Sequence, residues 1–311
     1  MHFAERLAFT QNECGAVAIA VTEMATNLFK HAREGRIVLQ TLPYQGHCPA
    51  LRVTSMDKGP GIRDISWALE DGRSSSGTGG AGLGAVRRLS QQFAIYSIPE
   101  TGTFISAEFW SGKKPFYSKG QMQVAALSIP IKGEQACGDG WAVKELPDAT
   151  IFMVVDGLGH GVHAAEAARE AERVLRESQD ASPERILQDC HGALRKTRGA
   201  ALAVAAINRE KRTVSFAGVG NIGASVVSPI GSRGMASHNG TVGHELHRIQ
   251  ELKFPWEQDS ILIMHSDGLS SRWNLSRYPG LRAQEPALIA AVLYNDFARE
   301  HDDATVLVVK N

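Results

Sequence analysis

The stretch IFMVVDGLGHG, residues 151–161, drives an apolar run into an aspartate and then places glycine at every second position. The run 151–155 has the length and the β-branched content of a buried strand. Asp156 follows it directly, and glycines occupy positions 157, 159 and 161. A carboxylate at the end of a buried strand, followed by backbone that other groups can approach, suggests a binding loop, although Asp-Gly is also a common turn pair.

Three further acidic sites have the same setting. CGDGW places Asp139 where a strand begins, and ILIMHSDGL drives a second apolar run into Asp267. REHDDATVLVV places Asp302 and Asp303 just before the last strand. A turn explains any one of these sites, but carboxylates gathered in space repel one another unless cations neutralise them. Hard divalent ions prefer such oxygen ligands, and two of them about 3.5–4 Å apart activate water for attack on phosphorus.

The motifs GDGW, VVDGLGHG, GVGN, HSDGL and DDATVLVV occur in an order that resembles the PP2C-type serine/threonine phosphatases, above all their bacterial SpoIIE/RsbX branch. The resemblance covers about residues 121–311. It implies two Mn²⁺ or Mg²⁺ ions and a water between them that attacks phosphoserine or phosphothreonine, with Asp156 essential for catalysis. The implied metal ligands are Asp139, Asp156, the Gly157 carbonyl, Asp267 and Asp302. Asp302 is preferred to Asp303 because it matches the first acid of the paired motif. No equivalent is found of the arginine with which eukaryotic members hold the phosphate.

Other side chains near these motifs leave alternatives open. A histidine could act as general acid for the leaving oxygen, but histidines are more often incidental surface or supporting residues. The four candidates are His160, His163, His265 and His301. Ser266, beside Asp267, invites a nucleophile interpretation, yet neither a Ser-His-Asp pattern nor a G-x-S-x-G turn supports it.

A second ordered set lies in the first half, where residues 15–34 have the apolar periodicity of a helix. Glu23 and Asn27 are four residues apart, so they share one face of that helix. Asp57, in DKGPGI, follows a strand and can accept a hydrogen bond from an exocyclic amine. Glycine lets a base lie close to the backbone, and a glycine run that ends at a helix N-terminus can receive phosphate. The glycines concerned are Gly59, Gly61, Gly77, Gly79, Gly82 and Gly84.

Each of these features has a plain alternative. The helix residues could simply be exposed, DKGPG could be a tight turn, and the glycine run could be a linker. Together, in this order, the three motifs resemble the GHKL ATP-binding fold of the RsbT/RsbW/SpoIIAB anti-sigma-factor serine kinases, over residues 1 to about 110. That resemblance implies Glu23 as catalytic base, Asn27 as ligand of the Mg²⁺ that accompanies ATP, and Asp57 as the adenine-reading residue. The six glycines would line the nucleotide and its lid.

The polar stretch SGKKPFYSKG, residues 111–120, predicts a linker between the two halves. We therefore expect a GHKL-type domain over 1–110 and a PP2C/SpoIIE-type domain over 121–311. The fold class is α+β. A GHKL (Bergerat) α/β sandwich comes first, and a PP2C-like β-sandwich flanked by helices follows it, because the second half shows strands in runs with a helix pair in the middle.

Composition excludes some partners and favours others. Lys and Arg together number 33, as do Asp and Glu, so we expect neither nucleic acid nor a membrane as partner. Four widely spaced cysteines indicate reduced thiols, and with no signal sequence visible we expect a cytoplasmic protein. The two resemblances imply a phosphatase joined to a serine-kinase-like ATP module in bacterial partner switching. Its partners would be phosphorylated STAS-domain anti-anti-sigma or stressosome proteins. A homodimer is compatible with the sequence. The alternative is an ATP-sensing module without kinase activity that regulates the phosphatase.

Overall fold

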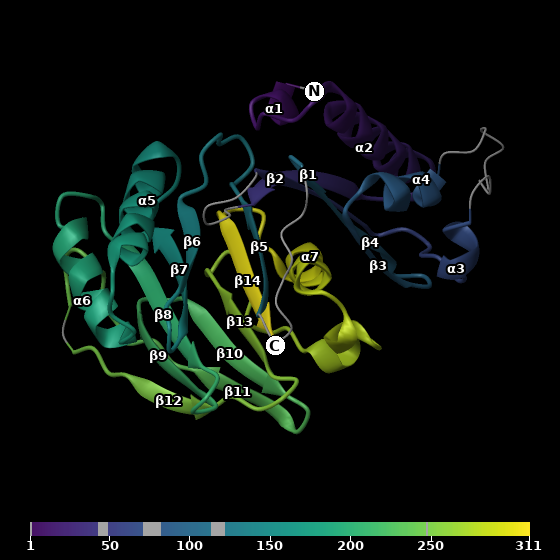
Figure 1. Ribbon diagram of the computed structural model, residues 1–311. Helices are drawn as coiled ribbons and strands as arrows, with labels where there is room; N and C mark the ends of the chain where they lie inside the picture. The colour runs from purple at the N-terminus through teal and green to yellow at the C-terminus, as the bar shows by residue number, and fades with distance from the viewer. Residues whose placement is uncertain (1, 43–48, 71–81, 113–121, 247) are drawn as a thin grey trace. The chain divides into compact units, whose positions relative to one another are not determined.

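The computed structural model describes residues 2–42, 49–70, 82–112, 122–246 and 248–311. The chain divides into two compact units, labelled by element in Figure 1. Unit 1 comprises Met1–Lys119 together with Leu275–Asn295, and unit 2 comprises Gly120–Asn274 and Asp296–Asn311. The division at 110 and 121 stays a prediction, and most of the expected linker lies outside the described residues. The assignment of Leu275–Asn295 to unit 1 had no counterpart in the sequence analysis.

Unit 1 is a four-stranded antiparallel sheet with helices packed against it, as expected for the first half. The strands lie in the order β1-β2-β4-β3. Its elements are α1 (His2–Glu5), α2 (Gln11–His31), β1 (Gly35–Leu42), β2 (Ala50–Asp57), α3 (Ile65–Ala68), α4 (Gly82–Leu89), β3 (Gln92–Ile98), β4 (Gly102–Trp110), η1 (Leu275–Arg277), η2 (Leu281–Ala283) and most of α7 (Pro286–Phe297).

The helix expected over 15–34 begins and ends earlier than predicted. A capping box starts it: the Thr10 side chain accepts a hydrogen bond from the Glu13 backbone N–H, and the Glu13 carboxylate accepts one from the Thr10 N–H. The helix ends at His31 because Ala32 is extended and β1 begins at Gly35. The T-x-x-E pattern of this capping box is visible in the sequence at residues 10–13, whereas apolar periodicity alone does not mark the start of the helix.

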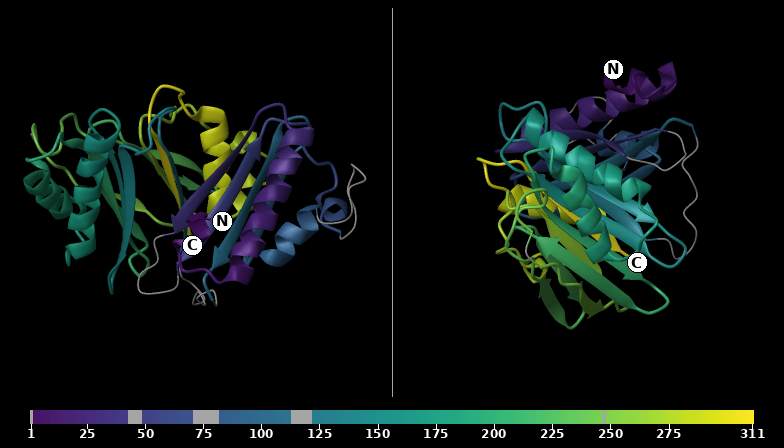
Figure 2. Two further views of the ribbon diagram at one scale, coloured as in Figure 1. Left: turned by 90° about the horizontal axis from the view of Figure 1, so that it is seen from above. Right: turned by 90° about the vertical axis from the view of Figure 1, so that its left-hand side faces the viewer.

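Both faces of the unit 1 sheet are covered. Along β4, Ile105, Ala107 and Phe109 pack in one cluster with the buried side of α2. The alternate residues point to the other face, and they are buried as well. On that second face the Tyr96 hydroxyl donates to the Pro279 carbonyl at 3.0 Å. The segment Leu275–Asn295 thus lies against the face opposite α2, as the left view of Figure 2 shows.

Unit 2 consists of two five-stranded sheets in which every neighbouring pair is antiparallel. One sheet has the order β11-β10-β13-β14-β5, and the other has the order β12-β9-β8-β7-β6. The elements are β5 (Gln123–Ile129), β6 (Asp139–Glu145), β7 (Thr150–Gly157), α5 (Val162–Glu177), α6 (Pro183–Leu194), β8 (Ala200–Asn208), β9 (Thr213–Val219), β10 (Gly223–Ser228), β11 (Gly231–Met235), β12 (Leu252–Pro255), β13 (Ile261–His265) and β14 (Ala304–Lys310). The short strand β11 has little apolar content, so its sequence carries no strand signal.

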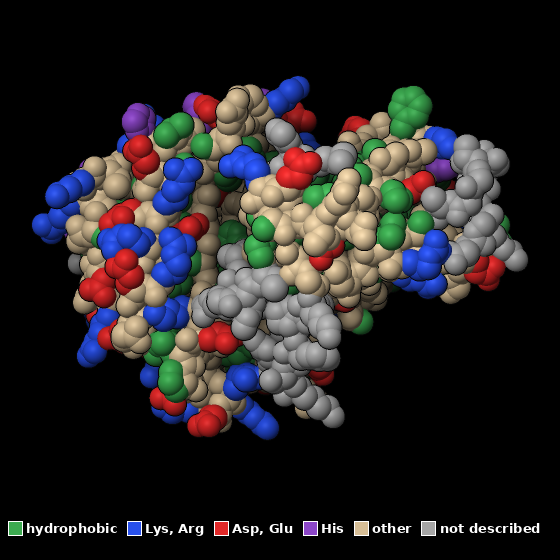
Figure 3. Space-filling view, turned by 45° about the horizontal axis from the view of Figure 1, so that its top comes forward, with side chains coloured by type: hydrophobic (Ala, Val, Ile, Leu, Met, Phe, Trp, Pro, Cys, Tyr) green, Lys and Arg blue, Asp and Glu red, His purple; other side chains and the backbone are tan. Residues whose placement is uncertain are grey.

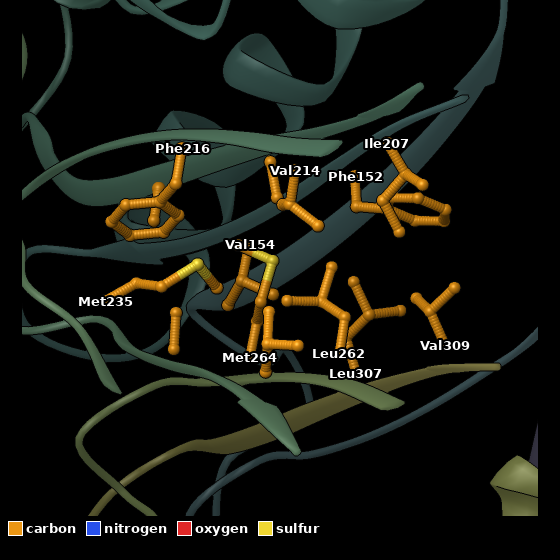
Figure 4. Packing of buried hydrophobic residues seen from close by; sticks show 14 of the residues in the cluster. Phe152, Val154, Ile207, Val214, Phe216, Met235, Leu262, Met264, Leu307 and Val309 are labelled. Atoms are coloured by element: carbon orange, nitrogen blue, oxygen red, sulfur yellow. The ribbon is translucent and has the colours of Figure 1, made fainter. Parts of the chain in front are cut away.

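The opening stretch of sequence is explained by burial of β7 on both sides. Phe152 and Val154 point into the core between the two sheets, where they meet Leu262, Leu307 and other residues (Figure 4). The odd-numbered residues 151, 153 and 155 face α5 and α6 on the outer side. A strand buried on both faces reads as a continuous apolar run rather than an alternating one. The predicted β-sandwich flanked by helices is confirmed for this unit.

The surface of unit 2 has no strong separation of charge on the face shown in Figure 3, where Lys and Arg side chains are interspersed with Asp and Glu. On α5, for example, Arg173 pairs with Glu170 at 2.7 Å. None of the helices in the described part of the chain combines the length and apolar character needed to cross a membrane.

Candidate metal centre and nucleotide site

Asp139 and Asp156 are cross-strand neighbours at one end of the β6–β7 hairpin. They face each other in the antiparallel register, since Asp139 begins β6 and Asp156 lies near the end of β7. Opposed side chains in such a pair have Cβ atoms about 4.5–5.5 Å apart. By alternation Asp156 points to the same side as Val154, which is the side of the opposite sheet. The two carboxylates therefore lie together at the edge of the space between the sheets.

Asp267 and Asp302 come together at the corresponding end of β13 and β14. His265 pairs with Val306 in the last step of that ladder, and the Ser266 N–H donates to the Thr305 carbonyl at 3.0 Å. The backbone continues in contact beyond the ladder: a Cβ placed on Gly268 would lie 1.9 Å from the Asp303 carbonyl oxygen. The two loops that carry the aspartates are thus held side by side.

Hydrogen bonds join these two halves of the site. Ser266 donates its hydroxyl to Asp139 Oδ2 at 2.6 Å. Asp303, from the strand β14 side, accepts the Gly138 N–H at 2.7 Å and the Ile131 N–H at 2.7 Å. The four predicted aspartates consequently form one cluster at the edge of the sandwich, and not four separate turns.

The cluster holds an excess of negative charge. Burial raises the pKa of Asp156, and the neighbouring Asp139, Asp267, Asp302 and Asp303 raise it further. Burial likewise raises the pKa of Asp139, with a contribution from Asp303, while the Ser266 hydrogen bond lowers it. Carboxylates in such a setting favour either protons or bound cations.

The residues present fit divalent ions. Asp139 Oδ1 is a buried oxygen without a hydrogen-bond partner in the described residues. A bound cation would satisfy this oxygen, because hard divalent ions prefer carboxylate ligands. Within the described ranges no three His, Cys, Asp or Glu side chains are already gathered closely enough to hold an ion. The set expected for the first ion contains only two carboxylates, from Asp139 and Asp156, with the Gly157 carbonyl as third donor. Asp267 and Asp302 would serve the second.

Two residues whose supporting role the sequence did not reveal, Asn221 and Ser266, hold the aspartates in place. Asn221, in the GVGN motif, donates from Nδ2 to Asp267 Oδ2 at 2.6 Å. Ser266 is fully buried, donates to Asp139 and accepts the Thr305 N–H at 2.9 Å. This arrangement assigns the serine to positioning and leaves the nucleophile interpretation without support. Both residues lie inside motifs that the sequence analysis quoted, so the signal was available.

The four candidate histidines differ in environment. His265 is buried, and burial lowers its pKa, although the hydrogen bond to the Ser266 carbonyl opposes this shift. Its Nδ1 lies 2.8 Å from that carbonyl, and its Nε2 accepts from the Trp273 indole at 3.2 Å. Both ring nitrogens are therefore occupied in the neutral form. His160 and His163 are exposed beside Glu134 and Glu166. His301 is also exposed.

In unit 1 the predicted nucleotide residues that the structure describes lie on α2, at the end of β2 and the loop after it, and at the start of α4. On α2, Glu23 and Asn27 are half-buried. Burial raises the pKa of Asp57, whose Oδ1 accepts the Gly59 N–H at 2.7 Å. A Cβ on Gly59 would lie 3.0 Å from the His31 carbonyl oxygen, so the loop after β2 touches the end of α2.

The glycines of this site are only partly described. Gly61 has φ +68°, and a Cβ there would lie 2.2 Å from the Ile98 carbonyl oxygen, so its close approach to β3 requires glycine. Gly82 and Gly84 lie in the first turn of α4. Gly77 and Gly79 lie outside the described residues. The nucleotide roles of all these residues stay predictions.

Comparison with known proteins finds the same two halves. Residues 147–311 match the family Stage II sporulation protein E (SpoIIE), and residues 1–109 match the family histidine kinase-like ATPase domain. The serine/threonine-protein kinase RsbT of Bacillus subtilis (strain 168) is 36% identical over 107 residues, which are 34% of this chain and 80% of RsbT. The phosphoserine phosphatase RsbX of that organism is 27% identical over 150 residues, which are 48% of this chain and 75% of RsbX.

Two solved structures resemble the chain in fold and sequence. A crystal structure of RsbX in complex with magnesium has a TM-score of 0.53 and 25% identity, and the match covers 62% of this chain and 96% of that one. A structure from work on the bacterial stressosome, a modular system adapted to control secondary messenger signalling, has a TM-score of 0.57 and 28% identity. That match covers 61% of this chain and 100% of the other.

Proposed function

Since the chain belongs to the SpoIIE family through residues 147–311, we propose that it is a metal-dependent phosphatase acting on phosphoserine or phosphothreonine in proteins. The observation that carries this proposal is the aspartate cluster at the strand ends, with the unpartnered buried oxygen of Asp139. Similarity to the phosphoserine phosphatase RsbX supports the reaction class. Similarity to a magnesium complex of RsbX supports Mg²⁺ or Mn²⁺ as cofactor.

The chain's own residues provide the frame for this chemistry. Two divalent ions, when bound, supply Lewis-acid activation of water and of the phosphate ester. Asp139, Asp156 and the Gly157 carbonyl would hold one ion, and Asp267 and Asp302 the other. Ser266 and Asn221 fix the orientation of Asp139 and Asp267 through the hydrogen bonds described above. Because these bonds come from buried or strand-end positions, the oxygen ligands are preorganised before substrate arrives.

The test is hydrolysis of a phosphoserine peptide by the full chain in the presence of Mn²⁺. Asp156→Asn should lower the rate at least 100-fold, because it removes a ligand charge at the centre of the cluster. Asp148→Asn is the matched control: it lies at the opposite end of the same β6–β7 hairpin, is exposed, and should leave the rate unchanged. Equal rates for the two variants would reject the assignment.

For unit 1 we propose ATP with Mg²⁺ as ligand and a cytoplasmic STAS-domain protein as phosphoryl acceptor. Similarity to the kinase RsbT supports the transfer, and similarity to a stressosome structure supports a setting of partner switching. Phosphorylated STAS-domain proteins would then also be the substrates of unit 2. Transfer of labelled phosphate from ATP to such a protein should disappear in Glu23→Gln and persist in Glu34→Gln, an exposed glutamate beyond α2. Labelling that survives in Glu23→Gln would reject the role of Glu23 as catalytic base.

A second candidate role for unit 1, regulation of the phosphatase, is favoured by the segment Leu275–Asn295. It begins eight residues after Asp267 and ends seven before Asp302, yet it belongs to unit 1. Besides the Tyr96 contact, Gln92 donates to Glu285 at 2.6 Å, and the Arg36 guanidinium lies 5.2 Å from the centroid of the Tyr294 ring. The chain therefore connects the sheet of unit 1 directly to the two stretches that carry Asp267 and Asp302.

A non-hydrolysable ATP analogue tests whether unit 1 regulates the phosphatase or is joined to it without affecting its rate. The analogue should change the phosphatase rate of the wild-type chain several-fold. Tyr96→Phe, which removes only the hydroxyl that binds the Pro279 carbonyl, should weaken this response. Thr101→Ala, in the exposed turn between β3 and β4, should not. A wild-type rate that ignores the analogue would exclude regulation by nucleotide.

A further inference from the structure

The strands that carry Asp156 continue side by side into the loop that follows. In the β7–β8 ladder Asp156 pairs with Ala201 and Gly157 with Ala200. One step further, the Leu158 N–H donates to the Gly199 carbonyl at 3.0 Å. The next residue along this path is Arg198, which places its backbone opposite the glycine-rich loop behind Asp156.

The side chain of Arg198 reaches that loop. A Cβ placed on Gly159 would lie 3.1 Å from Arg198 Nη1, so the guanidinium is in contact range of the loop backbone. The Gly159 carbonyl oxygen in turn would lie 3.4 Å from a Cβ on Gly138, the residue before Asp139. The guanidinium therefore lies at the rim of the aspartate cluster. Gly159 and Gly138 lie between it and Asp139, and neither carries a side chain that would block the path.

The charge of Arg198 is not used inside the described part of the chain. The residue is exposed, and no hydrogen bond or ion pair joins it to another described residue. On the neighbouring helices, by contrast, Arg173 and Arg185 each bind a carboxylate, from Glu170 and Asp180. An arginine without a carboxylate partner at the edge of an acidic cluster is free to bind an incoming anion.

A phosphate ester needs such a cation. The cluster contains five aspartates, at positions 139, 156, 267, 302 and 303, whereas two divalent ions carry only four positive charges. A loaded site thus keeps a net negative charge before a phosphate dianion arrives. A guanidinium attracts a phosphate dianion, and it binds phosphate oxygens through two parallel N–H bonds.

We propose that Arg198 binds the phosphoryl oxygens of the substrate at the rim of the aspartate cluster. This inference rests on the proposed phosphatase function and names the residue that grips the phosphate, for which the sequence offered no candidate. Arg198 contributes to substrate binding by holding the ester against the site. Other groups activate the attacking water and protonate the leaving oxygen.

The experiment uses the full chain with Mn²⁺ and compares three variants. Arg198→Gln removes the charge, Arg198→Lys keeps it without the forked geometry, and Lys196→Gln removes an exposed charge two residues away. For a phosphoserine peptide, Arg198→Gln should raise KM about 10- to 100-fold with kcat within a few-fold of wild type, as expected for lost ground-state binding. Arg198→Lys should fall between, and Lys196→Gln should match wild type.

Binding measurements give a readout that does not depend on turnover. By calorimetry on the Mn²⁺-loaded chain, Arg198→Gln should weaken the binding of inorganic phosphate by the same factor, while the affinity for Mn²⁺ stays unchanged. Phosphate affinity or KM equal to that of Lys196→Gln would overturn the proposal, as would a loss confined to kcat or to Mn²⁺ affinity. A wild-type chain that hydrolyses the peptide while Arg198→Gln is normal contradicts only this inference; a wild-type chain without hydrolysis contradicts the proposed function itself.

Discussion

Glu108 in unit 1 and Asp139 in unit 2 are both buried carboxylates, but the fold treats them in opposite ways. Glu108 Oε1 accepts two N–H bonds from Arg52, at 2.7 and 3.1 Å, and both side chains are almost completely buried. Asp139 receives the Ser266 hydroxyl on one oxygen, finds no partner for the other among the described residues, and lies among further carboxylates. A carboxylate whose cation belongs to the fold is structural, whereas one without a cation points to a ligand from outside.

Asp303 shows a third way to satisfy a buried carboxylate. Each of its oxygens accepts a backbone N–H, from Ile131 and from Gly138. The adjacent Asp302 is only partly buried. Burial is the main cause that raises its pKa, and the nearby Asp267 raises it further. Of two aspartates in sequence, one is therefore bound to the backbone and the other is left to face the cluster, which supports Asp302 as the predicted ligand.

Breaking the Arg52–Glu108 pair should have the largest effect on stability. Glu108→Gln leaves a buried guanidinium uncompensated, so we expect the unfolding free energy of unit 1 to fall by about 3–5 kcal/mol. The double variant Arg52→Met/Glu108→Leu should recover most of this loss, because buried pairs can often be replaced by apolar groups. Urea titration followed by circular dichroism measures both.

The exposed pair of Lys58 and Glu34, 2.8 Å apart, is the control for that experiment. Glu34→Gln should produce no measurable change, since an exposed pair is screened by solvent. If Glu108→Gln were as mild as Glu34→Gln, the structural role assigned to the buried pair would be wrong.

Separating Asp303 from Asp302 is the next test in size. Asp303→Asn leaves the Gly138 or Ile131 N–H without its acceptor, which should cost about 1–3 kcal/mol of stability. Asp302→Asn should instead weaken Mn²⁺ binding without lowering the metal-free stability, since it removes a charge from a repelling group. Denaturation and calorimetry on the two variants give a crossed pattern; the reverse pattern would make Asp303 the ligand.

The sequence was sufficient for the parts of the site that depend on strand ends. Asp139, Asp156, Asp267 and Asp302 could be singled out because each interrupts an apolar run or begins one, and the antiparallel register then brings them together. The two fold types could likewise be predicted from the order of the motifs. Fold prediction worked best where local pattern and tertiary burial agree, as in β7.

What the sequence could not show depends on contacts between distant segments. Tyr96 and Pro279 are 183 positions apart, so nothing in the local pattern assigns Leu275–Asn295 to unit 1. Arg198 lies in an ordinary polar turn between α6 and β8, and only the register of β7 with β8 brings it to the loop behind Asp156. The strand β11 escaped because four of its five residues are exposed and carry no apolar signal.

The effect of Asp139→Asn on stability should change sign between the metal-free and the Mn²⁺-bound protein. Without ions the variant removes one charge from a repelling group, while its amide oxygen can still accept the Ser266 hydroxyl. Stability should rise at pH 8, where the wild-type carboxyl is charged although burial and the neighbouring carboxylates raise its pKa. With excess Mn²⁺ the wild-type chain should become the more stable one. Thermal unfolding with EDTA and with Mn²⁺ measures this exchange; an unchanged order would mean that Asp139 binds no ion.

The smallest effect on stability is expected on α5, where two glutamates, Glu170 and Glu172, differ in burial. Burial raises the pKa of Glu172, although its carboxylate accepts the Trp141 N–H at 3.2 Å. A carboxyl whose pKa is raised on folding adds stability below the ordinary carboxyl pKa, about 4, and this contribution is lost as the pH rises through the raised value. Glu172→Gln should therefore stabilise unit 2 by less than about 1 kcal/mol at pH 8 and have no such effect at pH 4.

Glu170, two residues away, provides the control of opposite sign. Its hydrogen bonds with Arg173 lower its pKa, so its contribution is present above the ordinary carboxyl pKa and is lost as the pH falls. Glu170→Gln should consequently destabilise slightly at pH 8. Urea titrations of both variants at pH 4 and pH 8 decide the matter. Both glutamates have an arginine partner, Arg176 for Glu172 and Arg173 for Glu170. Shifts of the same sign at pH 8 would therefore show that burial, which distinguishes Glu172 from Glu170, does not decide the sign of their contributions to stability.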